Sequence, residues 1–127
     1  MEKTRIVIVD DEPHILRVLE LKLKNAGFEV FPAINGRDGL EKIREARPQA
    51  VISDVNMPEM GGLELMAACR ELRAEAPFFM IMLTAQTEPE VRAAIDAEPM
   101  TELMNKPFSP RKILERIEEH FRGRMAA

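Results

Sequence analysis

The stretch IVIVDDE, residues 6–12, decides the fold class of this chain. Its four apolar residues form a run of strand length without polar alternation, and three acids follow at once. Such a continuous run is typical of a strand whose sheet is covered by helices on both faces. Residues 50–52 and 78–83 repeat the pattern, while residues 29–31 and 102–104 are weaker strand predictions.

Amphipathic helices are predicted between these strands, because apolar residues recur there three or four positions apart. Glycine or proline closes the first four patterns. The last helix is expected to begin with Ser109 as its N-cap and Pro110 as its first residue. The apolar positions are Ile15, Leu16, Leu19 and Leu23; Leu40 and Ile43; Leu63, Met66, Cys69 and Leu72; Val91 and Ile95; and Ile113, Leu114, Ile117 and Phe121. The closing residues are Gly27, Pro48, Pro77 and Pro99.

Five strand–helix units in series predict an α/β fold, a single doubly wound (βα)5 domain over residues 1–127. The sheet is expected to be mostly parallel, with right-handed crossovers and helices on both faces. A chain of 127 residues has the size of one domain.

Charge and cysteine content exclude several classes of protein. The net charge of -4 does not favour nucleic-acid binding. A late basic cluster alternates with glutamates, as on a solvated helix face; its members are Arg111, Lys112, Arg116, Arg122 and Arg124. The single cysteine, Cys69, permits no intrachain disulfide and is expected to be half-buried. The apolar run at residues 6–9 is too short for a signal peptide or a membrane span. We therefore expect a cytoplasmic protein without membrane contact.

Polar residues follow the strands at the point where ligands bind in open parallel sheets. Asp10 and Asp11 follow the first run, Asp54 follows the third strand, Thr84 the fourth and Lys106 the fifth. Each residue alone has an ordinary interpretation. The aspartates could cap the following helix or turn, Thr84 could have no chemical role, and Lys106 could be a surface lysine. Their joint occurrence at successive strand ends indicates one shared site.

The residue types of that site indicate phosphoryl chemistry. Three clustered carboxylates repel one another and need a cation, and an all-oxygen set with few protein ligands suits Mg²⁺. A carboxylate nucleophile beside Mg²⁺ can form an aspartyl phosphate. Lys106 would add a second positive charge and Thr84 a hydrogen bond for the same phosphate.

The motifs DDE at 10–12, SDVNMP at 53–58 with GG at 61–62, LTA at 83–85 and NKPF at 105–108 resemble the receiver domains of two-component response regulators. The resemblance covers essentially the whole chain. It implies a flavodoxin-like fold with strand order 2-1-3-4-5, and commonly a cis peptide bond before Pro107. It also implies that phosphate draws Thr84 inward and rearranges the face formed by the fourth helix, fifth strand and fifth helix.

The resemblance also implies a role for each site residue. Asp54 would take the phosphoryl group from a phosphohistidine of a sensor histidine kinase or histidine phosphotransfer protein. Asp11, Asp54 and the backbone carbonyl of Asn56 would hold Mg²⁺, with Asp10 acting through a water. Thr84, Lys106 and the backbone N–H of Ala85 would hold the phosphoryl oxygens. The protein would then be a signalling module, with no enzymatic activity beyond phosphorylating and dephosphorylating itself.

Two departures from the family pattern fall on the face that signals onward. Leu103 stands where receivers usually carry Tyr or Phe, and Pro99-Met100 stands where they usually carry Gly-Ala. One hypothesis is that Met100, Leu103 and Met104 form an aliphatic, adaptable surface for a downstream protein. The alternative is that these three side chains belong to the core.

Other interpretations of the sequence remain open. A haloacid-dehalogenase-type phosphatase would need an acid two residues after the nucleophile, where this chain has Asn56. A degenerate receiver that binds partners without phosphate usually lacks an acid, the threonine or the lysine. We expect a monomer or a weak phosphorylation-dependent dimer, acting alone or as part of a longer protein. Asn56 and Gln86 are expected to set the phosphate lifetime, and His14 and His120 are expected at the surface.

Overall fold

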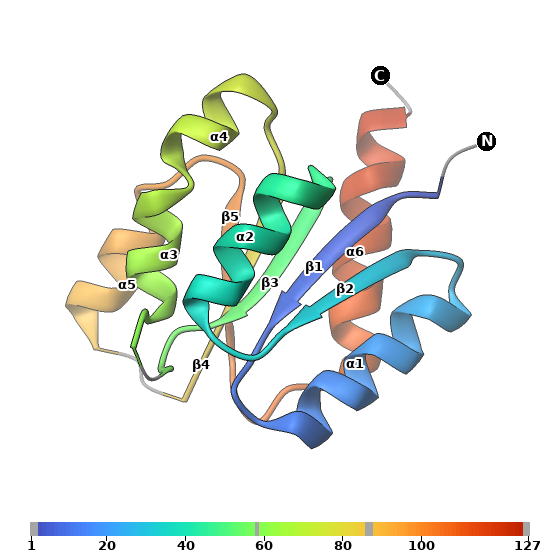
Figure 1. The fold of residues 1–127 in the computed structure, drawn as a ribbon, viewed down its shortest axis with the longest axis horizontal. Helices are drawn as coiled ribbons and strands as arrows, with labels where there is room; N and C mark the ends of the chain where they lie inside the picture. The colour runs from blue at the N-terminus through green and yellow to red at the C-terminus, as the bar shows by residue number, and fades with distance from the viewer. Residues whose placement is uncertain (1–2, 58, 86–87, 126–127) are drawn as a thin grey trace.

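Five parallel strands form one sheet in the order β2-β1-β3-β4-β5 (Figure 1). The structure, a computed structural model, describes residues 3–57, 59–85 and 88–125. The strands are β1 (Arg5–Val9), β2 (Glu29–Ala33), β3 (Ala50–Asp54), β4 (Phe79–Thr84) and β5 (Thr101–Asn105). The parallel α/β class and the strand order 2-1-3-4-5 are therefore confirmed, with the order reversing between β1 and β3.

In the described part of the chain, six helical segments connect and flank the strands. They are α1 (Pro13–Asn25), α2 (Gly36–Ala46), α3 (Gly62–Ala68), α4 (Arg70–Glu75), α5 (Pro89–Asp96) and α6 (Pro110–Met125). The predicted start of the last helix is confirmed, because the Ser109 carbonyl accepts from the Ile113 N–H at 3.1 Å and Pro110 is the first helical residue. Within the described part of the chain, no helix combines the length and the apolar character needed to cross a membrane.

The prediction of one helix through residues 63–72 is wrong, because the segment breaks at Cys69. The Cys69 N–H is shared between the carbonyls of Leu65 and Met66, at 3.0 and 3.3 Å, which tightens the backbone there. A new turn then starts where the Arg73 N–H donates to the Cys69 carbonyl at 2.8 Å. The apolar spacing continues through this break, so the sequence gives no sign of it.

Two apolar layers cover the sheet, one on each face. The first packs α1 and α6 against one face of the sheet; its strand residues include Ile6, Ile8, Ile52, Ile81 and Leu83. The second packs α2, α3 and α5 against the other face; its strand residues include Val7, Val9, Val51, Met80 and Met82. Side chains alternate between the layers along each strand, so both faces of the central strands need apolar residues. This is why their sequences read as continuous apolar runs.

The edge strand β5 differs from the central strands. All of its side chains are partly or fully exposed, whereas every residue of β4 is buried. Leu103 packs against the layer that contains Met80 and Met82, while Met104 packs against the opposite layer. Because only one strand flanks β5, its sequence carries less apolar character, and this accounts for the weak strand prediction at residues 102–104.

Cys69 is fully buried rather than half-buried, and burial raises the pKa of its thiol to about 11. Because the thiolate is the reactive form, the native thiol should be inert. We expect Ellman's reagent at pH 8 to modify folded protein only as fast as it unfolds, and to react at once in urea. Rapid stoichiometric labelling of the folded protein would contradict this burial. The chain has no other cysteine to confuse the signal.

Candidate phosphoacceptor site

Asp10 lies at the carboxyl end of β1 and uses its two carboxylate oxygens differently. Its Oδ1 accepts a hydrogen bond from the Glu12 N–H at 2.9 Å and so closes the turn into α1. Its Oδ2 is buried and has no hydrogen-bond partner among the described residues. The helix-capping interpretation of the acidic pair is thus wrong, because the N-cap of α1 is Glu12 and no side chain caps the first turn. The Asp10 Oδ2 is a buried acceptor that a ligand or water would satisfy.

Asp54 is the last residue of β3 and is only 4% exposed. Its Oδ1 accepts from the Asn56 N–H at 3.3 Å, and its Oδ2 accepts from the Lys106 Nζ at 3.0 Å. The carboxylate is therefore held in one orientation by a backbone donor and an ammonium group.

Lys106 follows β5 and reaches back across the edge of the sheet. Its backbone N–H donates to the Thr84 carbonyl at 2.8 Å, and a cis peptide bond joins it to Pro107. Its Nζ lies 3.8 Å from the Asp10 Oδ2 as well as 3.0 Å from Asp54. Burial lowers the pKa of Lys106, but the hydrogen bond to Asp54 and the charges of Asp10 and Asp54 outweigh it and raise the pKa overall. The side chain is therefore a fixed cation.

The three predicted aspartates do meet at this edge. Carboxylate oxygens of Asp10, Asp11 and Asp54 all lie within 4.8 Å of one another, with Asp11 at the exposed side. Burial raises the pKa of Asp10, and the neighbouring charges of Asp54 and Asp11 raise it further, against the Glu12 hydrogen bond and Lys106. The single positive charge of Lys106 does not neutralise the negative charges of the three carboxylates. An oxygen-only donor set with a buried unsatisfied oxygen fits a hard divalent cation such as Mg²⁺.

Thr84 and Ala85 lie at the same edge of the sheet, on the β4 side. Asp54 pairs in register with Leu83, so Thr84, the last residue of β4, and Ala85 after it extend past Asp54. Thr84 is buried, and Ala85 is exposed. Asn56 follows Asp54 and is exposed. Gln86, the other predicted lifetime residue, and Pro58 of the acceptor motif lie outside the described residues.

Gly62 has a structural role that motif matching alone did not reveal. A Cβ at this position would overlap the backbone oxygen of Asp54 and lie 2.8 Å from the Val55 Cα. The Gly62 N–H also donates to the Val55 carbonyl at 2.9 Å. The start of α3 therefore presses directly on the backbone that carries the acceptor carboxylate, and only glycine leaves room for this contact.

The residues predicted on the signalling face do not share one surface. Leu103 and Met104 line a hollow of about 310 Å³ between α5, β5 and α6, together with Ile81, Arg92, Asp96, Thr101, Glu102 and Arg116. Met100 lines a different hollow, beside α4. All three are partly buried and pack against the core. Leu103 and Met104 each have one side in the core and one in the hollow, so the core interpretation holds in part, and binding of a downstream protein there stays a prediction.

The two histidines, both predicted at the surface, differ in their exposure. His14 is exposed, with a side chain 75% accessible. His120 is only partly exposed, because its ring stacks on Phe79 at a centroid distance of 4.2 Å. Aromatic packing on the α6 side of the sheet therefore overrides the expectation from residue type.

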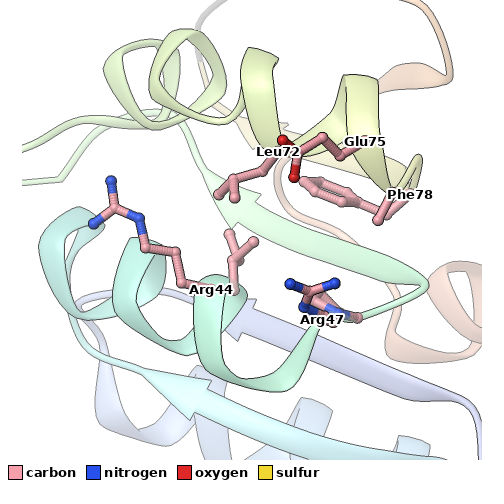
Figure 2. A pocket seen from close by; sticks show the side chains of 8 residues that line it. Arg44, Arg47, Leu72, Glu75 and Phe78 are labelled. Atoms are coloured by element: carbon pink, nitrogen blue, oxygen red, sulfur yellow. The ribbon is translucent and has the colours of Figure 1, made fainter.

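A third hollow lies away from the acidic site, between α2 and α4. Figure 2 shows Arg44 and Arg47 on one side of it and Leu72, Glu75 and Phe78 on the other. Its volume of about 50 Å³ is far below that of a small-molecule site. This region seats α4 against α2.

A doubly wound parallel sheet with three aspartates and a lysine clustered at its carboxyl edge defines a flavodoxin-like class of domain. Comparison with known families is consistent with this: residues 6–118 match the response regulator receiver domain. The chain belongs to that family.

Solved structures support the assignment. The chemotaxis protein CheY4 of Vibrio cholerae is 35% identical, with a TM-score of 0.84, over 93% of this chain and 98% of that one. A CheY-like receiver domain protein from Methanospirillum hungatei is 30% identical, with a TM-score of 0.89, over 98% of both chains.

The contact at Gly62 predicts that Gly62→Ala destabilises the fold and displaces the acceptor loop. Overpacking of this kind costs about 1–3 kcal/mol, because backbone and not a flexible side chain must move. Urea denaturation should show a lower midpoint with an unchanged slope. Glu64→Ala, at an exposed position in the same helical turn, is the matched control and should stay within about 0.5 kcal/mol of wild type. Equal midpoints for the two variants would contradict the assigned contact.

Proposed function

We propose that this receiver domain accepts a phosphoryl group on Asp54 from a phosphohistidine donor and thereby switches a protein-binding surface. The observation that carries the proposal is the Lys106 Nζ at 3.0 Å from the Asp54 Oδ2, inside a cluster with Asp10 and Asp11. A buried, oriented carboxylate beside a fixed cation is the arrangement expected of a carboxylate nucleophile.

Each residue has a task in the transfer. An Asp54 oxygen forms the new O–P bond as the P–N bond of the donor breaks, and the imidazole leaves with the electron pair. Lys106, the Thr84 hydroxyl and the Ala85 N–H would receive the three phosphoryl oxygens. Asp10, Asp11, Asp54 and the Asn56 carbonyl would hold Mg²⁺, which when bound neutralises charge on the transferring group. Hydrolysis of the aspartyl phosphate would return the domain to its starting state.

Two alternatives are disfavoured by residues of the site. A degenerate receiver would lack part of the acidic cluster, the threonine or the lysine, and all are present. A phosphatase that turns over substrate would need a general acid at position 56, where the Asn56 amide cannot donate a proton in this way. We therefore propose an activity limited to the domain's own phosphorylation and dephosphorylation.

The partners follow from this role. The donor would be a histidine kinase or a histidine phosphotransfer protein in the cytoplasm. The downstream target would bind the α5–β5–α6 face, where the hollow at Leu103 and Met104 has a rim of two arginines and two acids. A protein surface with an apolar anchor and mixed charges would complement it.

Phosphorylation on Asp54 is tested with acetyl phosphate and intact-mass measurement. Wild-type protein should gain one phosphoryl group only when Mg²⁺ is present, and Asp54→Ala should gain none. Glu41→Ala, which removes an exposed carboxylate from α2, should behave as wild type. An adduct that persists in Asp54→Ala, or that forms equally well with a chelator present, would refute the assignment.

The response face is tested by amide NMR with fluoroberyllate as the phosphate mimic. We expect shifts at Leu103 and Met104 in wild-type protein, because β5 connects these residues directly to Lys106. Asp54→Ala provides the control and should show none of them. If the mimic binds at Asp54 but leaves Leu103 and Met104 unchanged, the α5–β5–α6 face is not the output surface.

A further inference from the structure

The register of β5 decides whether Lys106 reaches Asp54. β5 lies at the edge of the sheet and pairs only with β4, from Met80 opposite Thr101 to Thr84 opposite Asn105. A slip by one residue would turn Leu103 to the opposite face and move Lys106 by about 3.3 Å. A displacement of that size would break the contact between the Lys106 Nζ and the Asp54 Oδ2.

The side chains of β5 specify this register only weakly. None of them is fully buried, and Glu102, Leu103 and Met104 do not alternate between polar and apolar. Register is strongly specified where one face of a strand is buried and apolar, which is not the case here. Contacts outside the strand therefore add to the alignment of β5 with β4.

Arg73 on α4 provides such a contact at the amino ends of both strands. Its guanidinium donates to the Phe78 carbonyl at 2.9 Å, just before β4 begins. It also donates to the Thr101 Oγ1 at 2.8 Å, at the first residue of β5, and to the carbonyls of Pro99 and Met100 at 2.8 and 3.0 Å. One planar cation thus binds the residues that lead into two neighbouring strands.

Met100 is held there in an unfavourable backbone conformation. Its φ is +55°, a left-handed value that residues with a Cβ rarely adopt. Its carbonyl accepts from the Met80 N–H at 2.9 Å as well as from Arg73, so this conformation is what directs the carbonyl to both donors. Strained residues of this kind persist only when their surroundings hold them.

The helix that carries Arg73 is itself anchored. Leu72 packs against the core layer of α2, α3 and α5, and it lines the small cavity that separates α4 from α2 (Figure 2). The Arg73 guanidinium also lies 4.9 Å from the centroid of the Phe78 ring. Burial lowers the pKa of Arg73, against the opposing influence of Glu98, so its hydrogen bonds must offset the loss of solvent.

We infer that Arg73 is a positioning residue for phosphoryl transfer, which sets the register of β5 by holding Met100 left-handed and so delivers Lys106 to Asp54. This inference rests on the proposed function and adds a residue at the opposite end of β5, about five residues or 17 Å along the strand from Lys106. Arg73 touches none of the reacting atoms.

The test compares Arg73→Gln with Arg70→Gln. Arg70 lies on the same helix, is mostly exposed and pairs with Glu98 at 2.7 Å, so its variant makes the same charge change without touching β5. With acetyl phosphate and Mg²⁺, we expect Arg73→Gln to slow phosphorylation about tenfold or more per folded molecule, as displaced catalytic groups do. Arg70→Gln should keep the wild-type rate.

Rescue by Met100→Gly separates positioning from general destabilisation. Glycine adopts a left-handed φ freely, so the double variant no longer needs Arg73 to hold residue 100. We expect Arg73→Gln/Met100→Gly to recover most of the lost rate. A double variant that is as slow as Arg73→Gln, or an Arg73→Gln protein that phosphorylates at the wild-type rate, would overturn the inference.

Hydrogen exchange gives a readout that does not depend on phosphorylation. The Met80 N–H, bonded to Met100, and the Lys106 N–H, bonded to Thr84, should exchange faster in Arg73→Gln than global unfolding explains. The Asp10 N–H, bonded to Ala33 on the far side of the sheet, should follow global stability alone.

If wild-type protein takes no phosphoryl group, the proposed function fails, and the exchange data then decide whether Arg73 sets the register. If Arg73→Gln does not fold, Thr101→Val, which removes one acceptor, takes its place in both measurements.

Discussion

The ion pair between the Lys106 Nζ and the Asp54 Oδ2 joins two segments 52 residues apart, and the site depends on it. Both groups are largely removed from water, with side chains 18% and 5% exposed. Attraction between opposite charges is strengthened where they are partly removed from water, so this pair holds Lys106 across the edge of the sheet from Asp54. The two further carboxylates, Asp10 and Asp11, leave the site with excess negative charge. The same imbalance that makes the site electrostatically unfavourable when empty makes it suited to a divalent cation.

The architecture produces this imbalance by bringing strand ends together. β1 and β3 lie side by side where the strand order reverses, which places Asp10 next to Asp54. Asp10 then serves both structure and chemistry, one oxygen closing the turn into α1 and the other facing the site. Gly62 likewise serves two purposes. Its close backbone contact with Asp54 and Val55 positions the start of α3 and also holds Asp54 in place.

β5 connects three features that lie apart in space. Lys106 follows its carboxyl end, Leu103 and Met104 line the hollow at its middle, and Arg73 holds its amino end. An edge strand with half-buried side chains is easier to displace than the central strands, whose residues are buried on both faces.

The sequence by itself determined the fold class, the order of elements and the members of the acidic site. Continuous apolar runs require a sheet covered on both faces, and parallel strands bring the polar residues after them to one edge, so local patterns were sufficient for Asp10, Asp11, Asp54, Thr84 and Lys106. Only the tertiary structure decided the break at Cys69, the stacking of His120 on Phe79, the separation of Met100 from Leu103 and the hydrogen bonds of Arg73. These depend on contacts between residues distant in the chain, which leave no periodic signal. A guanidinium that binds three carbonyls and a hydroxyl looks, in the sequence, like any arginine on a helix surface.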